Sequence, residues 1–211
     1  HYAGGLIFDG ANDYVRVATD LSPSLGATAT LAFWVKTMQT GGSVGWDAPG
    51  ITGVERTNSS NDIQWGWLDG SGRMNISVGD SVGATTAVAV NNGVWHHVAF
   101  TRDADSGATQ VYVDGLLRGA GSVPAGPITT AFSDLGRIDD TGGTPRYFSG
   151  TLDDVRVYNY VLQPTEIQVL AVSGPPVAVA DVRTIPEDTP IGIDVLANDV
   201  DPEAAPLSVA A

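Results

Sequence analysis

The chain has 211 residues, of which 43% are hydrophobic, so it is long and apolar enough for one domain with a packed core and part of another. Cysteine is absent, and no disulfide therefore stabilises the fold. The formal net charge of −14, with Lys36 the single lysine, excludes a surface that binds nucleic acid, and no apolar run is long enough for membrane insertion.

The first predicted element is a hairpin over residues 5–17. Its hydrophobic residues, such as Phe8, can face a core, whereas Asp9, Asn12 and Asp13 gather in the connection. Short oxygen-bearing side chains of this kind supply part of a calcium shell or, alternatively, form an Asx-rich turn without an ion. The acidic turns and the few cations of the whole chain also favour calcium, although aspartate marks loops in any acidic protein.

A strand is predicted over residues 29–36, where large apolar residues alternate with smaller or polar ones. The glycine-rich loop that follows, residues 39–50, contains Trp46 and Asp47. A tryptophan among small residues has little local apolar cover. Exposure for ligand binding and packing back onto the domain are therefore equal alternatives for Trp46.

Residues 63–78 form a second predicted hairpin. Trp65 and Trp67 are two positions apart, so a regular strand would place them on one face, where they could stack on sugar rings. Packing in the core is the alternative. Arg73 and Asn75 are predicted to face outward on the return strand and could hydrogen-bond a ligand, as polar residues of any half-exposed sheet could.

The clearest hairpin covers residues 94–119, with a turn of Asp, Ser and Gly between two alternating strands. His96 and His97 are adjacent, so their side chains point to opposite faces and cannot readily bind one metal ion.

Near the end of the domain, a strand over residues 133–138 is followed by a polar loop, a further strand and a short helix that starts near Pro164. The loop and its return are rich in groups that can contact a ligand. They add four candidate glycan contacts, which are Asp139, Asp140, Arg146 and Tyr147.

Three phrases carry a family resemblance. FDGANDYVRV at residues 8–17, WHHVA followed by a polar turn and VYVDG at residues 95–115, and TLDDVRVYN at residues 151–159 resemble bacterial laminin G-like domains. These domains belong to the concanavalin A-like lectin/glucanase superfamily, and the likeness covers about residues 4–172. It implies an all-β fold, a two-sheet antiparallel jelly-roll sandwich with a short helix near its C-terminal end.

The resemblance also implies a calcium site where the first hairpin meets the closing strand. Matched residue by residue, Asp9 and Asp153 are the best candidate ligands, with Asn12 and Asp154 beside them. Two carboxylates brought together by pairing of the first and last strands would repel unless a cation lay between them. Neutralisation by arginine, from Arg16 or Arg156, is the alternative.

The composition changes at Gly174. Residues 175–211 contain seven acidic residues and one arginine, and the phrases EDTP and IDVLANDVDP resemble the start of a bacterial cadherin-like or Ig-like repeat. The predicted organisation is a jelly roll at residues 1–173, a proline-rich linker at 174–180 and the N-terminal part of such a repeat at 181–211. The neighbouring domains of a long, secreted or cell-surface chain are therefore expected partners.

The residues argue against catalysis. Each of the four glutamates stands alone in the sequence, without the paired carboxylates of a glycosidase strand, and no Gly-x-Ser-x-Gly motif occurs. We predict a non-catalytic, calcium-binding module that recognises a polysaccharide or cell-surface glycan. The alternatives are a protein-adhesion or spacer module with purely structural calcium and, third, a polysaccharide-cleaving enzyme domain.

Overall fold

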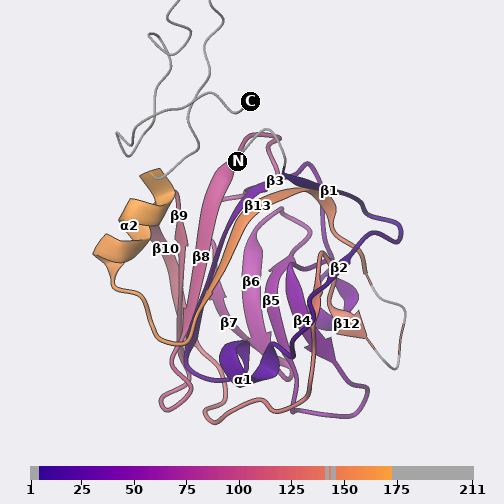
Figure 1. The fold of residues 1–211 in the computed structure, drawn as a ribbon, viewed down its shortest axis with the longest axis vertical. Helices are drawn as coiled ribbons and strands as arrows, with labels where there is room; N and C mark the ends of the chain where they lie inside the picture. The colour runs from indigo at the N-terminus through magenta and orange to yellow at the C-terminus, as the bar shows by residue number, and fades with distance from the viewer. Residues whose placement is uncertain (1–4, 141–142, 144–145, 173–211) are drawn as a thin grey trace, which may run out of the picture.

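The structure is a computed structural model that describes residues 5–140, 143 and 146–172. Two β-sheets pack face to face around one core, and a helix lies against the outside of one sheet (Figure 1). The predicted all-β sandwich with a short helix near its end is confirmed. The predicted linker and the predicted partial repeat lie outside the described residues.

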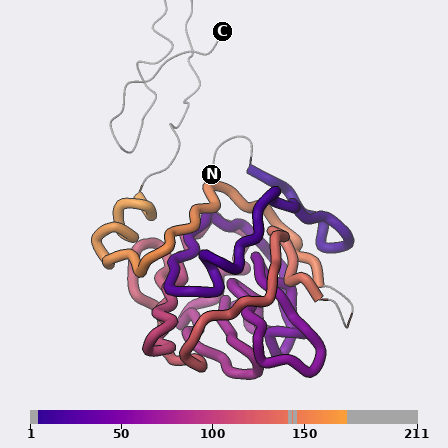
Figure 2. Tube along the Cα trace, turned by 60° about the horizontal axis from the view of Figure 1, so that its bottom comes forward, coloured from indigo at the N-terminus to yellow at the C-terminus, as the bar shows by residue number. Residues whose placement is uncertain are grey.

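The first sheet, called sheet A, has six strands in the order β1-β13-β3-β8-β9-β10. Their bounds are β1 Leu6–Asp9, β3 Ala29–Lys36, β8 His96–Arg102, β9 Ala108–Val113, β10 Leu116–Ser122 and β13 Ser149–Tyr158. The first strand pairs with the last, with Leu6 opposite Leu152 and Asp9 opposite Ser149. Figure 2 shows the indigo start of the chain close to the orange closing strand at this edge.

The second sheet, called sheet B, runs in the order β2-β11-β4-β5-β6-β7, with β12 added in parallel to β4. Its strands are β2 Val15–Arg16, β4 Thr52–Glu55, β5 Ile63–Leu68, β6 Met74–Val78, β7 Ser81–Thr85, β11 Asp134–Leu135 and β12 Asp139–Asp140. Two single turns interrupt the connections, α1 at Ser22–Leu25 and the 3₁₀ turn η1 at Gly45–Asp47.

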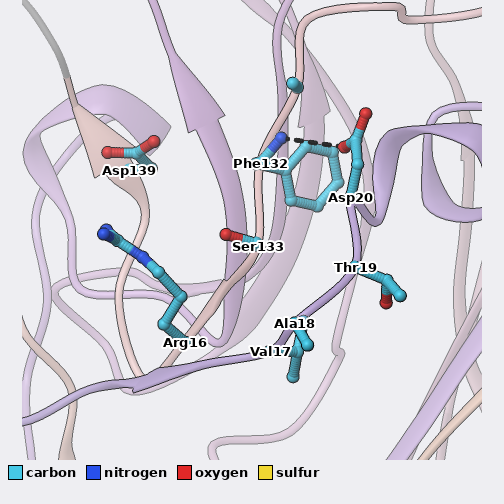
Figure 3. Close-up of a pocket in the computed structure, with 9 residues that line it drawn as sticks. Arg16, Val17, Ala18, Thr19, Asp20, Phe132, Ser133 and Asp139 are labelled. Carbon is cyan, nitrogen blue, oxygen red and sulfur yellow. Dashed lines mark hydrogen bonds between the residues drawn. The ribbon is translucent and has the colours of Figure 1, made fainter.

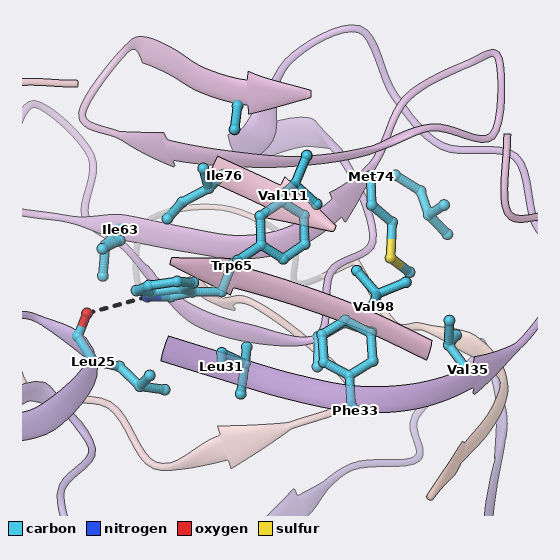
Figure 4. Close-up of a cluster of buried hydrophobic side chains, with 14 of the residues drawn as sticks. Leu25, Leu31, Phe33, Val35, Ile63, Trp65, Met74, Ile76, Val98 and Val111 are labelled. Carbon is cyan, nitrogen blue, oxygen red and sulfur yellow. Dashed lines mark hydrogen bonds between the residues drawn. The ribbon is translucent and has the colours of Figure 1, made fainter. Parts of the chain in front are cut away.

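The core lies between the inner faces of the two sheets (Figure 4). Leu31, Phe33 and Val35 of β3 are fully buried in it, as the alternation of residues 29–36 predicts. Trp65 of β5 also lies there, and its indole Nε1 donates a hydrogen bond to the Leu25 carbonyl at 3.2 Å. Burial of each such side chain stabilises the fold by about 1.5–3 kcal/mol.

The outer faces of the two sheets differ. Helix α2, Pro164–Val172, packs on sheet A through Ile167 and Leu170 and forms a second apolar cluster with Tyr112 and its neighbours. Its first turn is fixed by Glu166, whose carboxylate accepts a hydrogen bond from the Gln163 amide at 2.6 Å. The outer face of sheet B instead meets η1, which lies against β5 and β6. No helix in the described ranges is both long and apolar enough to cross a membrane.

His96 and His97 are consecutive residues of β8, and they lie opposite Val35 and Trp34 of β3, respectively. Their side chains therefore point to opposite faces of the sheet, as predicted. The imidazole of His97 is 2% exposed and its ring lies 5.5 Å from that of Trp34. Burial lowers the pKa of His97 to about 4, so its side chain is neutral at physiological pH. This agrees with a structural role.

A β-bulge at Gly66 separates the two tryptophans of β5. Trp65 lies opposite Ile76, whereas Trp67 lies opposite Asn75, and the register shifts between them. Gly66 has a φ of +68°, in the left-handed region that glycine adopts without strain. Trp65 therefore faces the core and Trp67 faces outward beneath η1. The prediction that they share one face is wrong, because a period of two does not hold across a bulge.

Candidate functional site

A polar hollow with one exposed aromatic side chain lies at the outer side of sheet B. It has a volume of about 640 Å³ and is lined by Trp46, Glu55, Thr57, Asn58, Ser59, Ser60, Asp80, Asp140 and Gly143. We call it the Trp46 hollow. Trp46 is 54% exposed on η1, whereas its neighbour Gly45 is buried against sheet B. Of the two alternatives for Trp46, the structure shows the exposed one.

Sheet pairing places carboxylates around this hollow. Glu55 ends β4, and Asp140 of the parallel strand β12 lies beside it in register. Asp80 comes from the turn between β6 and β7. Asp62 lies directly before β5, but it is buried and is not one of the lining residues. The hollow is thus framed by acidic residues that are distant in sequence, which no local motif indicates.

Glu55 has an unusual electrostatic environment. Burial, together with the charges of Asp62, Asp140 and Asp80, raises the pKa of Glu55 to about 7, although a hydrogen bond from Gln64 opposes the shift. Gln64 Nε2 donates that bond to Glu55 Oε2 at 2.9 Å. The Glu55 carboxyl therefore takes up a proton at higher pH than an ordinary glutamate, and in its protonated form it can donate as well as accept a hydrogen bond.

Part of the predicted glycan-contacting set comes together at this place. Arg146 donates hydrogen bonds to Asp47 Oδ1, at 3.0 Å from Nε and 2.6 Å from Nη2, next to Trp46 in the chain. Asp140 lines the hollow and accepts a hydrogen bond from the Gly143 amide at 2.7 Å. The structure thus groups Trp46, Asp47, Asp140 and Arg146.

The predicted contacts of the β5–β6 hairpin are corrected. Trp65, Trp67 and Asn75 are 0%, 3% and 2% exposed, so none presents a surface to a ligand. Trp67 Nε1 donates to Ser77 Oγ at 2.7 Å, and the Asn75 amide bonds the Trp67 and Arg73 carbonyls. Their polar atoms stabilise the hairpin itself.

Arg73 also has a local partner. Its Nε lies 2.8 Å from Asp69 Oδ2 across the β5–β6 turn, where Asp69 also accepts hydrogen bonds from the backbone. This arrangement closes the turn. Arg73 is not among the residues that line the Trp46 hollow.

Asp139 and Tyr147 belong to an ion-pair network that the sequence does not indicate. Asp134, 1% exposed, accepts hydrogen bonds from Arg16 Nε and Arg137 Nε, both at 2.8 Å. Burial opposes ionisation of Asp134, but the two guanidinium groups outweigh it and hold its pKa below the usual range. Asp139 lies 3.6 Å from Arg137, and Tyr147 Oη accepts a bond from the same guanidinium at 3.4 Å.

A second hollow, of about 610 Å³, lies beside β2 (Figure 3). Arg16 and Asp20 are among its lining residues, but both side chains are hydrogen-bonded within the protein. Asp20 Oδ1 accepts hydrogen bonds from the amides of Ser22 and Phe132, at 2.9 and 3.2 Å, and Arg16 holds Asp134. It offers no exposed aromatic side chain comparable to Trp46, so the Trp46 hollow is the better candidate site.

The predicted calcium ligands do not form one site. Asp9 lies opposite Ser149, four positions before Asp153 on β13, so the two aspartates are separated by roughly 13 Å along the ladder. The Asp9 carboxylate accepts hydrogen bonds from the amides of Ala11 and Asn12, which is the Asx-rich turn of the alternative. The prediction that Asp9, Asn12 and Asp153 bind one ion is therefore wrong.

The neighbouring Asp154 supports the arginine alternative. Its Oδ1 accepts a hydrogen bond from Arg156 Nε at 2.7 Å, at a bulge where Asp154 has a φ of +48°. Within the described part of the chain, no group of three or more Asp, Glu or His residues is arranged to hold a metal ion. The described residues do not fit a calcium site of the predicted kind.

The sequence matches two known families. The model of the family described as the concanavalin A-like lectin/glucanases superfamily matches residues 9–168, and that of the bacterial Ig domain matches residues 173–211. Both agree with the predicted resemblances. The predicted domain boundaries remain a prediction.

Two relatives among characterised proteins are much longer than this chain. The mouse "Sushi, von Willebrand factor type A, EGF and pentraxin domain-containing protein 1" is 26% identical over 181 residues, which are 81% of this chain and 5% of that protein. Human neuronal pentraxin-1 is 29% identical over 152 residues, 67% of this chain and 33% of its own length. The chain therefore spans a small part of either relative.

Solved structures share the fold. Domain 4 of an extracellular GH43 arabinanase from Geobacillus stearothermophilus, in complex with arabinotriose, has a TM-score of 0.60 at 22% identity, over 81% of this chain and 78% of that one. The CBM40 of a Ruminococcus gnavus sialidase, bound to α2,3-sialyllactose, has a TM-score of 0.54 at 17% identity. The match covers 80% of this chain and 100% of that one. A SAP-like pentraxin from Limulus polyphemus has a TM-score of 0.55 at 19% identity, over 78% of this chain and 80% of that one.

Proposed function

Because this chain belongs to the concanavalin A-like lectin/glucanases superfamily, we propose that its sandwich is a non-catalytic carbohydrate-recognition module of a secreted or cell-surface multidomain protein. One observation carries the proposal. A tryptophan that is 54% exposed stands at the rim of a hollow whose other walls are carboxylates, hydroxyls and an amide.

This combination suits a sugar. The apolar C–H face of a pyranose ring packs on the flat indole, because Trp provides a large, rigid contact surface with little conformational freedom to lose. Hydroxyl groups of the sugar then reach Glu55, Asn58 and Asp140 around the hollow. Binding sites of this type are mostly pre-formed and orient the ligand with a few polar groups.

The comparisons are compatible with this proposal. Two proteins with this fold are described in complex with oligosaccharides, arabinotriose in one and sialyllactose in the other. The adjoining match to a bacterial Ig domain supports a multidomain parent chain. The neighbouring domains of that chain are the second class of proposed partner.

Catalysis is the second candidate function, and Glu55 is the reason to test it. A carboxyl group with a pKa of about 7 and a second carboxylate nearby are the requirements of a glycosidase. Each of these groups is, however, hydrogen-bonded within the protein, Glu55 to Gln64 and Asp140 to the Gly143 amide. We expect no release of reducing sugar from any glycan that binds. Release that Glu55→Gln abolishes would establish an enzyme.

Replacing Trp46 by alanine is expected to weaken glycan binding by about tenfold or more, since about 1.4 kcal/mol is a modest value for a central aromatic contact. A glycan array would identify a ligand, and isothermal titration calorimetry would measure the loss. Trp46→Phe should retain part of the affinity because it keeps a flat ring.

Tyr160→Ser is the matched control, because Tyr160 is 47% exposed next to Tyr158 of sheet A, away from the hollow. It should bind as the unmodified protein does. Equal binding by Trp46→Ala would reject this site. A folded protein that binds nothing across plant, algal and animal glycans would favour the protein-adhesion or spacer alternative.

Calcium binding also remains a prediction. We expect calcium to raise the melting temperature and a chelator to reverse the effect. Differential scanning fluorimetry measures this directly. If melting is the same in calcium and in chelator, calcium has no part in the stability of the module.

A further inference from the structure

We propose that the Trp46 hollow selects a glycan with a protonated amine, a hexosamine with a free amino group, over the same glycan in N-acetylated form. Glycans with carboxylate groups are excluded by the same feature. This inference rests on the proposed function, because it names the class of sugar that the same site takes.

The charges around the hollow are almost all negative. Glu55, Asp80 and Asp140 line it from three different strands or turns, and Asp62 lies close enough to Glu55 to affect its ionisation. An anionic sugar such as a uronate or a sialate would meet repulsion here, whereas an ammonium group would meet attraction.

The nearby cations are already paired. Arg146 contacts Asp47 at 2.6 Å, and Arg56 lies 3.8 Å from Asp139. Each guanidinium thus has a carboxylate partner that does not line the hollow, although Arg56 Nη1 has no hydrogen-bond partner among the described residues. The carboxylates of the hollow are left without a basic side chain of their own among its lining residues.

A buried acceptor without a partner lies behind the lining residues of the hollow. Gln64 is 1% exposed, and its Oε1 atom has no hydrogen-bond partner among the described residues. The amide lies between Glu55, to which Nε2 donates, and Gly45, whose added Cβ would lie 3.2 Å from Oε1. Gly45 precedes Trp46, so this amide lies next to two walls of the hollow. An ammonium group brings three donors and no acceptor.

The spacing of the carboxylates favours an organic cation over a metal ion. Calcium requires six to eight oxygen ligands within about 2.6 Å. No three acidic groups of the described chain meet such a requirement, and these carboxylates are spread around a hollow of about 640 Å³. A sugar ring can stack on Trp46 while its amine reaches the acidic wall.

The ionisation of Glu55 also favours a positively charged ligand. Neighbouring carboxylates contribute to the raised pKa of about 7, so a positive charge placed among them would favour the ionised form. N-acetylation removes that charge and replaces it with a neutral amide. The amine and the N-acetyl forms therefore differ in the one interaction that the hollow favours.

The test compares chitosan oligosaccharide, which has free amines, with the chitin oligosaccharide of equal length, which is N-acetylated. Calorimetric titration at about 0.15 M salt limits long-range attraction to the acidic protein. We expect at least tenfold tighter binding of the chitosan form and no binding of oligogalacturonate. Glu55→Gln and Asp140→Asn should each reduce the preference for the amine several-fold.

Asp105→Asn is the charge-matched control, because Asp105 is exposed on the β8–β9 turn. If Asp105→Asn reduces the preference as much as Glu55→Gln does, the attraction belongs to the net charge and the inference is wrong. If the N-acetylated or a neutral glycan binds equally well and Trp46→Ala abolishes its binding, the inference fails and the proposed function stands. If no glycan binds the folded protein, the proposed function fails as well.

Discussion

Replacing Asp134 by alanine is expected to lower the free energy of unfolding by about 3–5 kcal/mol, the usual cost of removing one partner from a buried ion pair. Asp134 is 1% exposed and joins Arg16 of β2 to Arg137. The Arg137 side chain is 11% exposed, so the substitution would leave a buried guanidinium without its carboxylate. Urea denaturation followed by circular dichroism measures the change.

The pKa of Asp134 gives the same pair a pH dependence. The pKa of Asp134 in the folded state is below the usual value for Asp. The ion pair therefore contributes its full stability at pH values above that usual pKa, and the contribution is lost as the pH falls through the lowered pKa. Asp105→Ala on the exposed β8–β9 turn should change stability by less than about 0.5 kcal/mol. A loss of under 1 kcal/mol for Asp134→Ala would show that the network is not a main source of stability.

Replacing Trp65 by alanine is expected to cost about 3–5 kcal/mol of stability, because a large side chain would be removed from a closed core. Trp65 is fully buried, and its Nε1 bond to Leu25 ties β5 to α1 (Figure 4). Thermal and urea denaturation should show the loss, whereas glycan affinity of the folded fraction should stay unchanged.

Trp46→Ala should give the opposite pattern, with binding lost and stability nearly unchanged. The two tryptophans therefore form a matched pair that separates a packing role from a ligand-contacting role. Loss of binding in folded Trp65→Ala, with little loss of stability, would contradict the structure.

The strands were predictable where alternation is regular. Residues 29–36 form β3 over the full predicted range, and the hairpin of residues 94–119 forms β8 and β9 with β10 after it. In both places residues of one parity face the core between the sheets. Most residues of the other parity in β3 and β8 are buried as well, partly because α2 packs on the outer face of sheet A. Helix α2 begins at Pro164, where proline and Glu166 provide a local start signal.

The site was only partly predictable, for two physical reasons. Gly66 reverses the parity of β5, and a glycine with positive φ looks the same in sequence as any other glycine. The register of β1 on β13 sets how far Asp9 lies from Asp153, and register depends on the whole sheet. Glu55 gains its environment from β12 and from the β6–β7 turn, which approach it only in the folded chain.

The pairing of the first strand with the last also determines how the sandwich responds to mechanical force. β1 runs antiparallel to β13, and β13 continues from Leu152, opposite Leu6, to Tyr158. A pull between the start of β1 and the end of β13 therefore acts at one end of the pair and loads its hydrogen bonds one after another. Since β1 has four residues, tension would peel this edge strand from sheet A before it reached the core. The module would therefore begin to unfold at this edge of sheet A. The face that carries Trp46 belongs to sheet B.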